Sequence, residues 1–174
     1  IAEHGMEQFV RDARITTLYE GTTGIQALDL AGRKLQQLRG AGLEEMLAMI
    51  AGFCDAHAAD PDLAEFIYPL RAKAAEWASL SRGIAARAAG DPEETGAASF
   101  DYLMYSGYVA LAYWWARSVA AAAQAAGPAG LAEAKRGTAR FFFRRILPRT
   151  LSHKTAIESG SAPLMSLPSE LFHT

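Results

Sequence analysis

A long, almost uncharged apolar run in the second half of the chain sets the strongest limit on its fold. Residues 93–126 predict one long helix, and its middle, 100–115, is apolar on several sides. The stretch 102–116 carries no charge, but it is shorter than the roughly 20 residues that a membrane span needs. Asp101 and Arg117 bound it on either side. We therefore predict the central buried helix of a helical bundle, and we expect no membrane partner.

Helical spacing of apolar residues continues on both sides of this run. An amphipathic helix is predicted over 23–38, and Gly40 and Gly42 separate it from the next one at 43–58. Further helices are expected at 2–11, 60–89, 129–147 and 150–159, with a loop at 11–19. No segment alternates polar and apolar residues as a half-buried strand does. The predicted fold class is therefore all-α, a helical bundle.

Prolines set several of the expected helix boundaries. Asp60 is the expected N-cap of the 60–89 helix, with Pro61 in its first turn, and Pro69 should kink or split that helix. Pro148 should end or bend the helix at 129–147. The tail, 160–174, is rich in apolar residues, which predicts an extended segment packed on the bundle.

Charge and cysteine content exclude some classes of protein. The 174 residues carry a formal net charge of −2, which opposes a general nucleic-acid binder, because phosphate affinity comes from concentrated Lys and Arg. Cys54 is the single cysteine, so it forms no disulfide within the chain. No His, Cys and carboxylate cluster has metal-ligand spacing. The chain opens with Ile1 and no secretory signal is visible, so we expect a piece of a longer, cytoplasmic protein.

The segment 11–26 carries the candidate site. Glu20 lies beside a glycine and just before a predicted helix N-terminus, where the helix dipole favours negative charge. Thr23 to Gln26 has the form of a capping box, in which the two side chains hydrogen-bond each other's backbone N–H groups, so the helix should begin at Thr22 or Thr23. Glu20 is either an ordinary carboxylate that stabilises this helix end or a group with a chemical function.

The run Arg-Asp-Ala-Arg-Ile-Thr-Thr-Leu-Tyr-Glu-Gly-Thr-Thr-Gly-Ile-Gln at 11–26 resembles the C-terminal signature of acyl-CoA dehydrogenases. The resemblance implies that Glu20 is the catalytic base, that Gly21 lines the substrate and that Thr22 lines the flavin. Many members carry Gln two residues after that Thr, to contact the FAD nucleotide, where this chain has Gly24. At Gly24 the resemblance therefore leaves only a backbone contact to the cofactor.

The Glu-Gly-Thr-Thr-Gly-Ile-Gln form is similar to a longer branch of that family, in which an extra helical domain follows the dehydrogenase core. On this resemblance, 1–40 is the end of the dehydrogenase C-terminal helical domain and 41–174 is the additional domain. The implied reaction is α,β-dehydrogenation of an acyl-CoA thioester, with FAD held mostly by residues upstream of this chain. We expect the isolated chain to lack FAD and to be inactive, and the apolar bundle to form a homo-oligomer.

A basic ridge on the predicted 129–147 helix allows two interpretations. Arg136, Arg140 and Arg144 fall four residues apart and so share one side of a helix. The ridge suits a phosphate contact, to coenzyme A or to nucleic acid, or a salt-bridged face that covers acidic neighbours. Two further functions stay open: a helical oligomerisation or interaction domain without chemistry, and a DNA-binding alkylation-response relative of the family, supported by this ridge alone.

Overall fold

The computed structural model describes residues 5–18, 22–125 and 127–173, and these ranges consist of helices joined by turns and loops, with no strand among them. The all-α prediction is confirmed. The elements are α1 (Glu7–Arg14), the 3-10 turn η2 (Ile15–Thr17), α2 (Thr23–Leu28), the π-helix η3 (Asp29–Gln37), α3 (Ala41–Ala56), α4 (Ala64–Ala88), α5 (Glu93–Gln124), α6 (Leu131–Phe141), the π-helix η4 (Phe142–Ile146), the 3-10 turn η5 (Leu147–Arg149), α7 (Thr150–Ser159), α8 (Ala162–Met165) and the 3-10 helix η6 (Ser169–His173).

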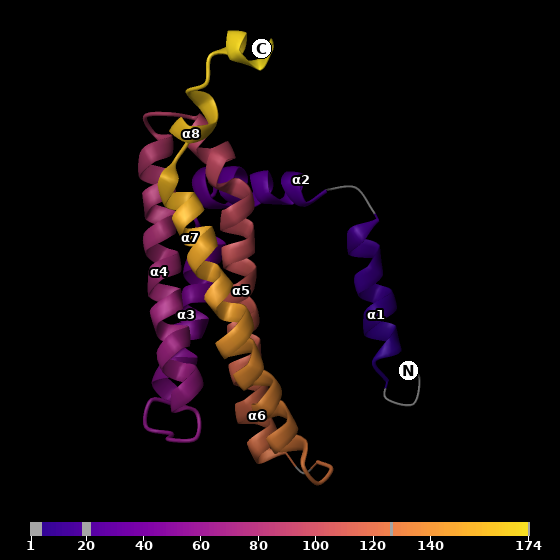
Figure 1. Cartoon of the computed structure of the whole chain (residues 1–174). Coiled ribbons are helices and arrows are strands. Elements are labelled where there is room, and N and C mark those ends of the chain that lie inside the picture. The colour runs from indigo at the N-terminus through magenta and orange to yellow at the C-terminus, as the bar shows by residue number, and fades with distance from the viewer. Residues whose placement is uncertain (1–4, 19–21, 126, 174) are drawn as a thin grey trace.

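The long helices form one elongated bundle around α5 (Figure 1). Helices α3 and α4 lie along one side, and α6 and α7 follow each other along the other, while α2 runs crosswise near one end. Helix α1 stands apart from the bundle, and the C-terminal tail extends beyond its end. This arrangement places residues 5–18 and 162–172 outside the packed body.

Helix α5 is central because one stripe of its surface is apolar and regularly spaced. Residues buried on it recur at alternating steps of four and three, which keeps a single seam facing the neighbouring helices. The seam consists of Ala98, Tyr102, Tyr105, Val109, Ala112, Ala116 and Val119. No helix in the described ranges is long and apolar enough to cross a membrane. The predicted central buried helix is therefore confirmed, with bounds close to those expected.

Aromatic side chains from other helices complete this core. Phe66 of α4 meets Phe143 of η4 edge to face, with ring centroids 5.2 Å apart. Phe53 of α3 meets Tyr113 of α5 in the same way at 5.8 Å. Such edge-to-face pairs add to the free energy gained from burying the rings. The bundle thus has one continuous core that also includes Leu35 of η3, so residues on both sides of the predicted boundary at 40/41 share it.

Three expected boundaries were wrong. Helix α1 begins at Glu7 and continues through Arg14, so much of the expected loop at 11–19 is helical. Asp60 does not cap α4, because its carboxylate accepts the backbone N–H of Asp62 at 2.9 Å and closes a separate turn. Helix α4 therefore begins at Ala64, and Pro69 lies inside it without splitting it.

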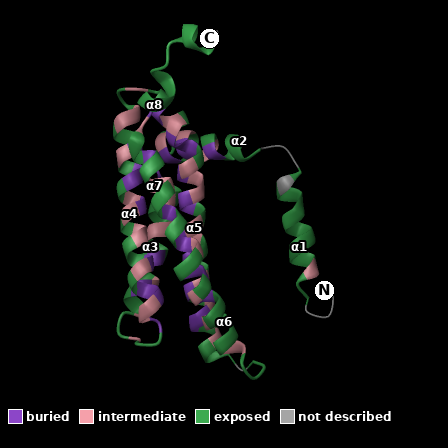
Figure 2. Ribbon diagram, in the orientation of Figure 1, coloured by how far each residue is buried: buried purple, intermediate pink, exposed green. Residues whose placement is uncertain are grey.

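The expectation for the C-terminal tail was also wrong. Ser161 is buried, but every residue from 162 to 172 is exposed (Figure 2). Gly160 has a φ of +71°, which turns the chain away from α7, so the tail leaves the end of the bundle instead of lying along it. The exposed apolar tail residues are Leu164, Met165, Leu167, Leu171 and Phe172.

Candidate functional site

The predicted catalytic residues are only partly within the described part of the chain. Glu20 and Gly21 lie outside it. Thr22 is the N-cap of α2, with φ −52° and ψ 164°, and the helix begins at Thr23, as expected. The capping box is not formed. The N-cap residue is Thr22, and its side chain makes no capping hydrogen bond. The third helical position is then Ile25, whose side chain cannot hydrogen-bond the backbone N–H of Thr22.

Thr22 and Gly24 lie at the solvent-exposed surface. Both residues are exposed, and a Cβ placed on Gly24 would meet no atom within 4 Å. The Thr22 hydroxyl is not used to cap its own helix, and the backbone at Gly24 is uncovered. The two residues predicted to contact the cofactor therefore both lie at the surface of the described part of the chain.

The helix that carries these residues is anchored from one side only. Ala27 of α2 and Ala31 and Leu35 of η3 are buried against the bundle. Gln36 of η3 donates a hydrogen bond to the Thr95 hydroxyl of α5, with Nε2 and Oγ1 2.5 Å apart. Ile25 and Leu28 of α2 are apolar and exposed. The bundle thus fixes α2 and η3 in place and leaves these two side chains of α2 uncovered within the described ranges.

The basic ridge is a salt-bridged face, which was one of its two predicted interpretations. Arg140 holds Glu65 of α4 through two hydrogen bonds, of 2.9 Å from Nε and 2.6 Å from Nη2. Arg144 lies 3.6 Å from the same carboxylate, and Arg136 donates to the Asp62 carbonyl oxygen at 2.7 Å. Arg140 lowers the pKa of Glu65 through its hydrogen bond. The ridge therefore clamps α6 to the start of α4, while its other interpretation, a phosphate contact, stays a prediction.

Sequence reasoning missed a second charged cluster, which joins α4, α5 and α7. Glu76 accepts hydrogen bonds from Lys73 at 2.6 Å, from the Tyr105 hydroxyl at 2.6 Å and from Lys154 at 3.0 Å. Burial tends to raise the pKa of Glu76, but these three donors outweigh it and lower the pKa from 4.5 to about 2. A carboxylate held in its charged form by three donors is a poor proton acceptor. The cluster therefore stabilises the bundle and is not a candidate base.

A histidine of α7 also pairs with a carboxylate of α5, Asp101, which lies one helical turn before Tyr105. His153 Nδ1 of α7 lies 2.7 Å from Asp101 Oδ1, and the His153 ring stacks on Tyr108 with centroids 5.7 Å apart. The only sequence signal for either cluster was the Lys73–Glu76 spacing of three, since the other partners lie on separate helices. No group of three or more His, Cys, Asp or Glu residues in the described ranges could hold a metal ion.

Comparison with known proteins agrees with this helical architecture. Residues 46–168, most of the chain, match the family described as acetyl-CoA dehydrogenase C-terminal like. The chain therefore belongs to this family, and the resemblance to acyl-CoA dehydrogenases is confirmed.

Two similar proteins are named as dehydrogenases. A 3-methylmercaptopropionyl-CoA dehydrogenase of Ruegeria pomeroyi is 37% identical over an alignment 174 residues long. That alignment covers 94% of this chain and 29% of the relative. A broad-specificity linear acyl-CoA dehydrogenase of Mycobacterium tuberculosis is 31% identical over an alignment 188 residues long. That alignment covers 99% of this chain and 30% of the relative. The chain thus spans less than a third of the length of these relatives.

Proposed function

We propose that the protein containing this chain is an FAD-dependent acyl-CoA dehydrogenase in which Glu20 removes the α-proton of the acyl thioester. The observation that carries the proposal is family membership over 46–168, together with the signature at 11–26, which precedes that range in the chain. The names of the two relatives support the same reaction class. In this proposal the isolated chain has no activity, because it spans less than a third of the relatives.

The chemistry explains why a glutamate suits this position. A proton next to a thioester carbonyl is weakly acidic, so a base must be held close to it and the developing enolate charge must be stabilised. A glutamate is a poor base in water, with a reference pKa of about 4.3, and removal of water from the site raises its basicity. We assign proton removal to the Glu20 carboxylate and enolate stabilisation to the Glu20 backbone N–H.

The residues after the base would hold the cofactor. Thr22 offers a hydroxyl that does not cap its own helix, and Gly24 offers uncovered backbone. FAD, when bound, supplies the acceptor for the hydride that leaves the β-carbon of the substrate. Because α2 continues into η3 and η3 is anchored on α5, the remainder of the bundle serves to hold this segment in place.

An interaction role for the bundle is compatible with this activity. Exposed apolar residues include Phe9 and Val10 of α1, Ile25 and Leu28 of α2 and several residues of the tail, and of these elements α1 and the tail lie outside the packed body. Exposed apolar surface of this extent is typical of surfaces that meet another protein or another domain. We therefore propose that these elements join the chain to the remainder of the dehydrogenase or to a second subunit.

The test of the dehydrogenase proposal uses the full-length protein. We expect it to purify with bound flavin and to lose its flavin absorbance band when an acyl-CoA thioester is added without oxygen, because the substrate reduces the cofactor. The 174-residue chain, expressed alone, should be colourless. A full-length protein that binds no flavin, or whose flavin band does not change with short-, medium- or long-chain thioesters, would refute the proposal.

A further inference from the structure

The C-terminal tail presents large apolar side chains to solvent. Leu164 and Met165 belong to α8, Leu171 and Phe172 belong to η6, and Leu167 lies between these two short helical turns. Their exposed fractions run from 48% at Leu167 to 70% at Phe172. Apolar surface of this kind is stabilised when it leaves water, so the tail has the character of a segment that another surface covers.

The tail leaves the bundle at a fixed point. Ser161 donates its backbone N–H to Glu94 at 2.9 Å and its hydroxyl to Asp91 at 2.6 Å. Both carboxylates lie where α4 ends and α5 begins. From there Gly160, with its positive φ, directs the chain beyond that end of the bundle (Figure 1). The tail therefore starts beside the end of α4 and points away from its own bundle.

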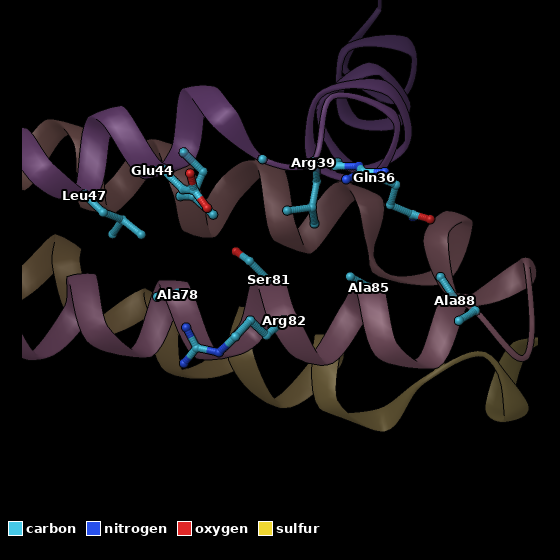
Figure 3. Close-up of a pocket in the computed structure, with 13 residues that line it drawn as sticks. Gln36, Arg39, Glu44, Leu47, Ala78, Ser81, Arg82, Ala85 and Ala88 are labelled. Atoms are coloured by element: carbon cyan, nitrogen blue, oxygen red, sulfur yellow. The ribbon is translucent and has the colours of Figure 1, made fainter.

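A groove between η3, α3 and α4 lies near the same end of the bundle. The labelled side chains of α4 face those of η3 and α3 across it, and its volume is about 560 Å³ (Figure 3). We call it the η3–α4 groove, and its lining consists of Leu35, Gln36, Arg39, Gly40, Leu43, Glu44, Leu47, Ala78, Ser81, Arg82, Ala85, Ala88 and Ala89.

The tail and the η3–α4 groove match in length and in side-chain size. The α4 wall of the groove runs from Ala78 to Ala89, a rise of about 17 Å along the helix. The segment from Leu164 to Phe172 spans about 12 Å as a helix and about 26 Å when extended, and the tail combines helical turns with extended links. The small alanines of α4 leave room for larger side chains opposite the groove's leucines.

The charges of the two surfaces are complementary. Glu170 is the only charged residue in the segment 162–172. The groove carries Arg39 on one side and Arg82 on the other, against Glu44 (Figure 3). A tail that lies along the groove brings its carboxylate within reach of one arginine or the other. Such an exposed pair fixes the orientation of the tail more than it adds affinity.

We propose that the tail of one copy of this chain occupies the η3–α4 groove of a second copy. Because the tail begins near the end of the bundle where the groove lies, two copies related by a two-fold axis at that end exchange their tails reciprocally. Short helical turns with apolar anchors are a common way of filling such a groove. This inference rests on the interaction role proposed above for the tail. It needs neither flavin nor thioester, so its failure is distinct from failure of the dehydrogenase proposal.

The experiment mixes two forms of the 174-residue chain and follows backbone amide signals by NMR. One form is isotope-labelled, and the other is unlabelled and carries a nitroxide at Ser169→Cys, an exposed tail position. Cys54 is fully buried and stays free of the nitroxide. We expect broadening of the groove signals, at Gly40, Leu43 and Ala85, because in this mixture broadening comes only from a neighbouring copy. A nitroxide at Glu133→Cys, an exposed position on α6 at the other end of the bundle, should leave these signals unchanged.

Sedimentation equilibrium measures the association itself. Leu171→Ser combined with Phe172→Ser should weaken it at least tenfold, because two large apolar side chains no longer leave water. Ala85→Trp should fill the groove and weaken association to a similar extent. The control is Ala86→Trp, which lies next to it on α4, is exposed and does not line the groove, and it should associate as the original chain does. Circular dichroism checks that each variant is folded.

Several results would overturn the proposal. The first is a chain that stays monomeric at NMR concentrations. The second is broadening of the groove signals only when the nitroxide and the isotope are in the same molecule, which means that the tail covers its own groove. Equal association of Ala85→Trp and the original chain, or equal loss in Ala86→Trp, would also overturn it.

Discussion

Glu76 shows how a charged residue stabilises this bundle. Its carboxylate joins three helices through Lys73, Tyr105 and Lys154, and its side chain is 23% exposed. Burial and the nearby carboxylate also raise the pKa of the Tyr105 hydroxyl, which keeps that group a donor at neutral pH. Because the charged form of Glu76 is favoured in the folded state, the free energy of unfolding depends on pH through this residue.

The direction of that dependence follows from the lowered pKa of Glu76. The contribution is fully present above the ordinary value of 4.5 and is lost as pH falls towards about 2. We expect the original chain to lose about 1–2 kcal/mol more unfolding free energy than Glu76→Gln between about pH 6 and about pH 3. Urea unfolding at the two pH values measures this difference.

Glu158→Gln is the matched control for this experiment. Glu158 lies 3.9 Å from Lys154 at a 53% exposed position, so its removal should leave the acid dependence of the original chain almost unchanged. The assignment to Glu76 fails if Glu76→Gln and the original chain lose the same unfolding free energy on acidification.

At the scale of elements, the end of α7 depends on one glycine. Gly160 has φ +71° and ψ −166°, a conformation that other residues rarely adopt. A Cβ at this position would lie 2.7 Å from Glu94 Oε1. That carboxylate accepts the Ser161 N–H at 2.9 Å and the Arg87 Nε–H at 2.7 Å. Gly160 therefore lets the end of α7 close onto the start of α5.

We expect Gly160→Ala to lower the free energy of unfolding by about 2 kcal/mol, through backbone strain and displacement of Glu94. The control is Gly137→Ala, in the exposed interior of α6, where a Cβ meets no atom within 4 Å. That substitution should stabilise the chain by about 0.5–1 kcal/mol, because alanine is the better helix former. Chemical denaturation should show a lower free energy of unfolding for Gly160→Ala and a higher one for Gly137→Ala. Destabilisation by both substitutions would contradict this account.

The sequence predicted elements well where apolar spacing was regular. The α5 prediction succeeded because its buried residues recur along one long seam between Pro92 and Gly127. The start of α4 was missed because Asp60 can close a turn as readily as it can cap a helix, and only the neighbouring backbone decides. The tail was missed because its hydrophobicity indicates a covered segment without indicating which surface covers it.

The candidate site was less accessible to sequence reasoning than the fold. Glu20 was assigned by resemblance alone, since a carboxylate near a helix start is common and no spacing rule makes it a base. The salt-bridged interpretation of the basic ridge could be established only when its partners Asp62 and Glu65 were placed.

The whole molecule combines a well-packed bundle with apolar elements that lie outside it. Helix α1 has no buried residue, and Phe9 and Val10 are each 68% exposed. An isolated helix of this length is marginal in water, so packing against another surface is needed to stabilise it. Since the chain spans less than a third of its relatives, the remainder of the dehydrogenase is the surface that we propose for it.

The most direct test of the central claim is turnover by the full-length protein carrying Glu20→Gln, measured with an acyl-CoA substrate and an electron acceptor. We predict that turnover is abolished while flavin content stays equal to that of the original protein, because the base is lost and the cofactor contacts remain. Glu45→Gln, at an exposed position on α3, is the control and should retain activity. Full activity in Glu20→Gln would contradict the assignment of Glu20 as the base.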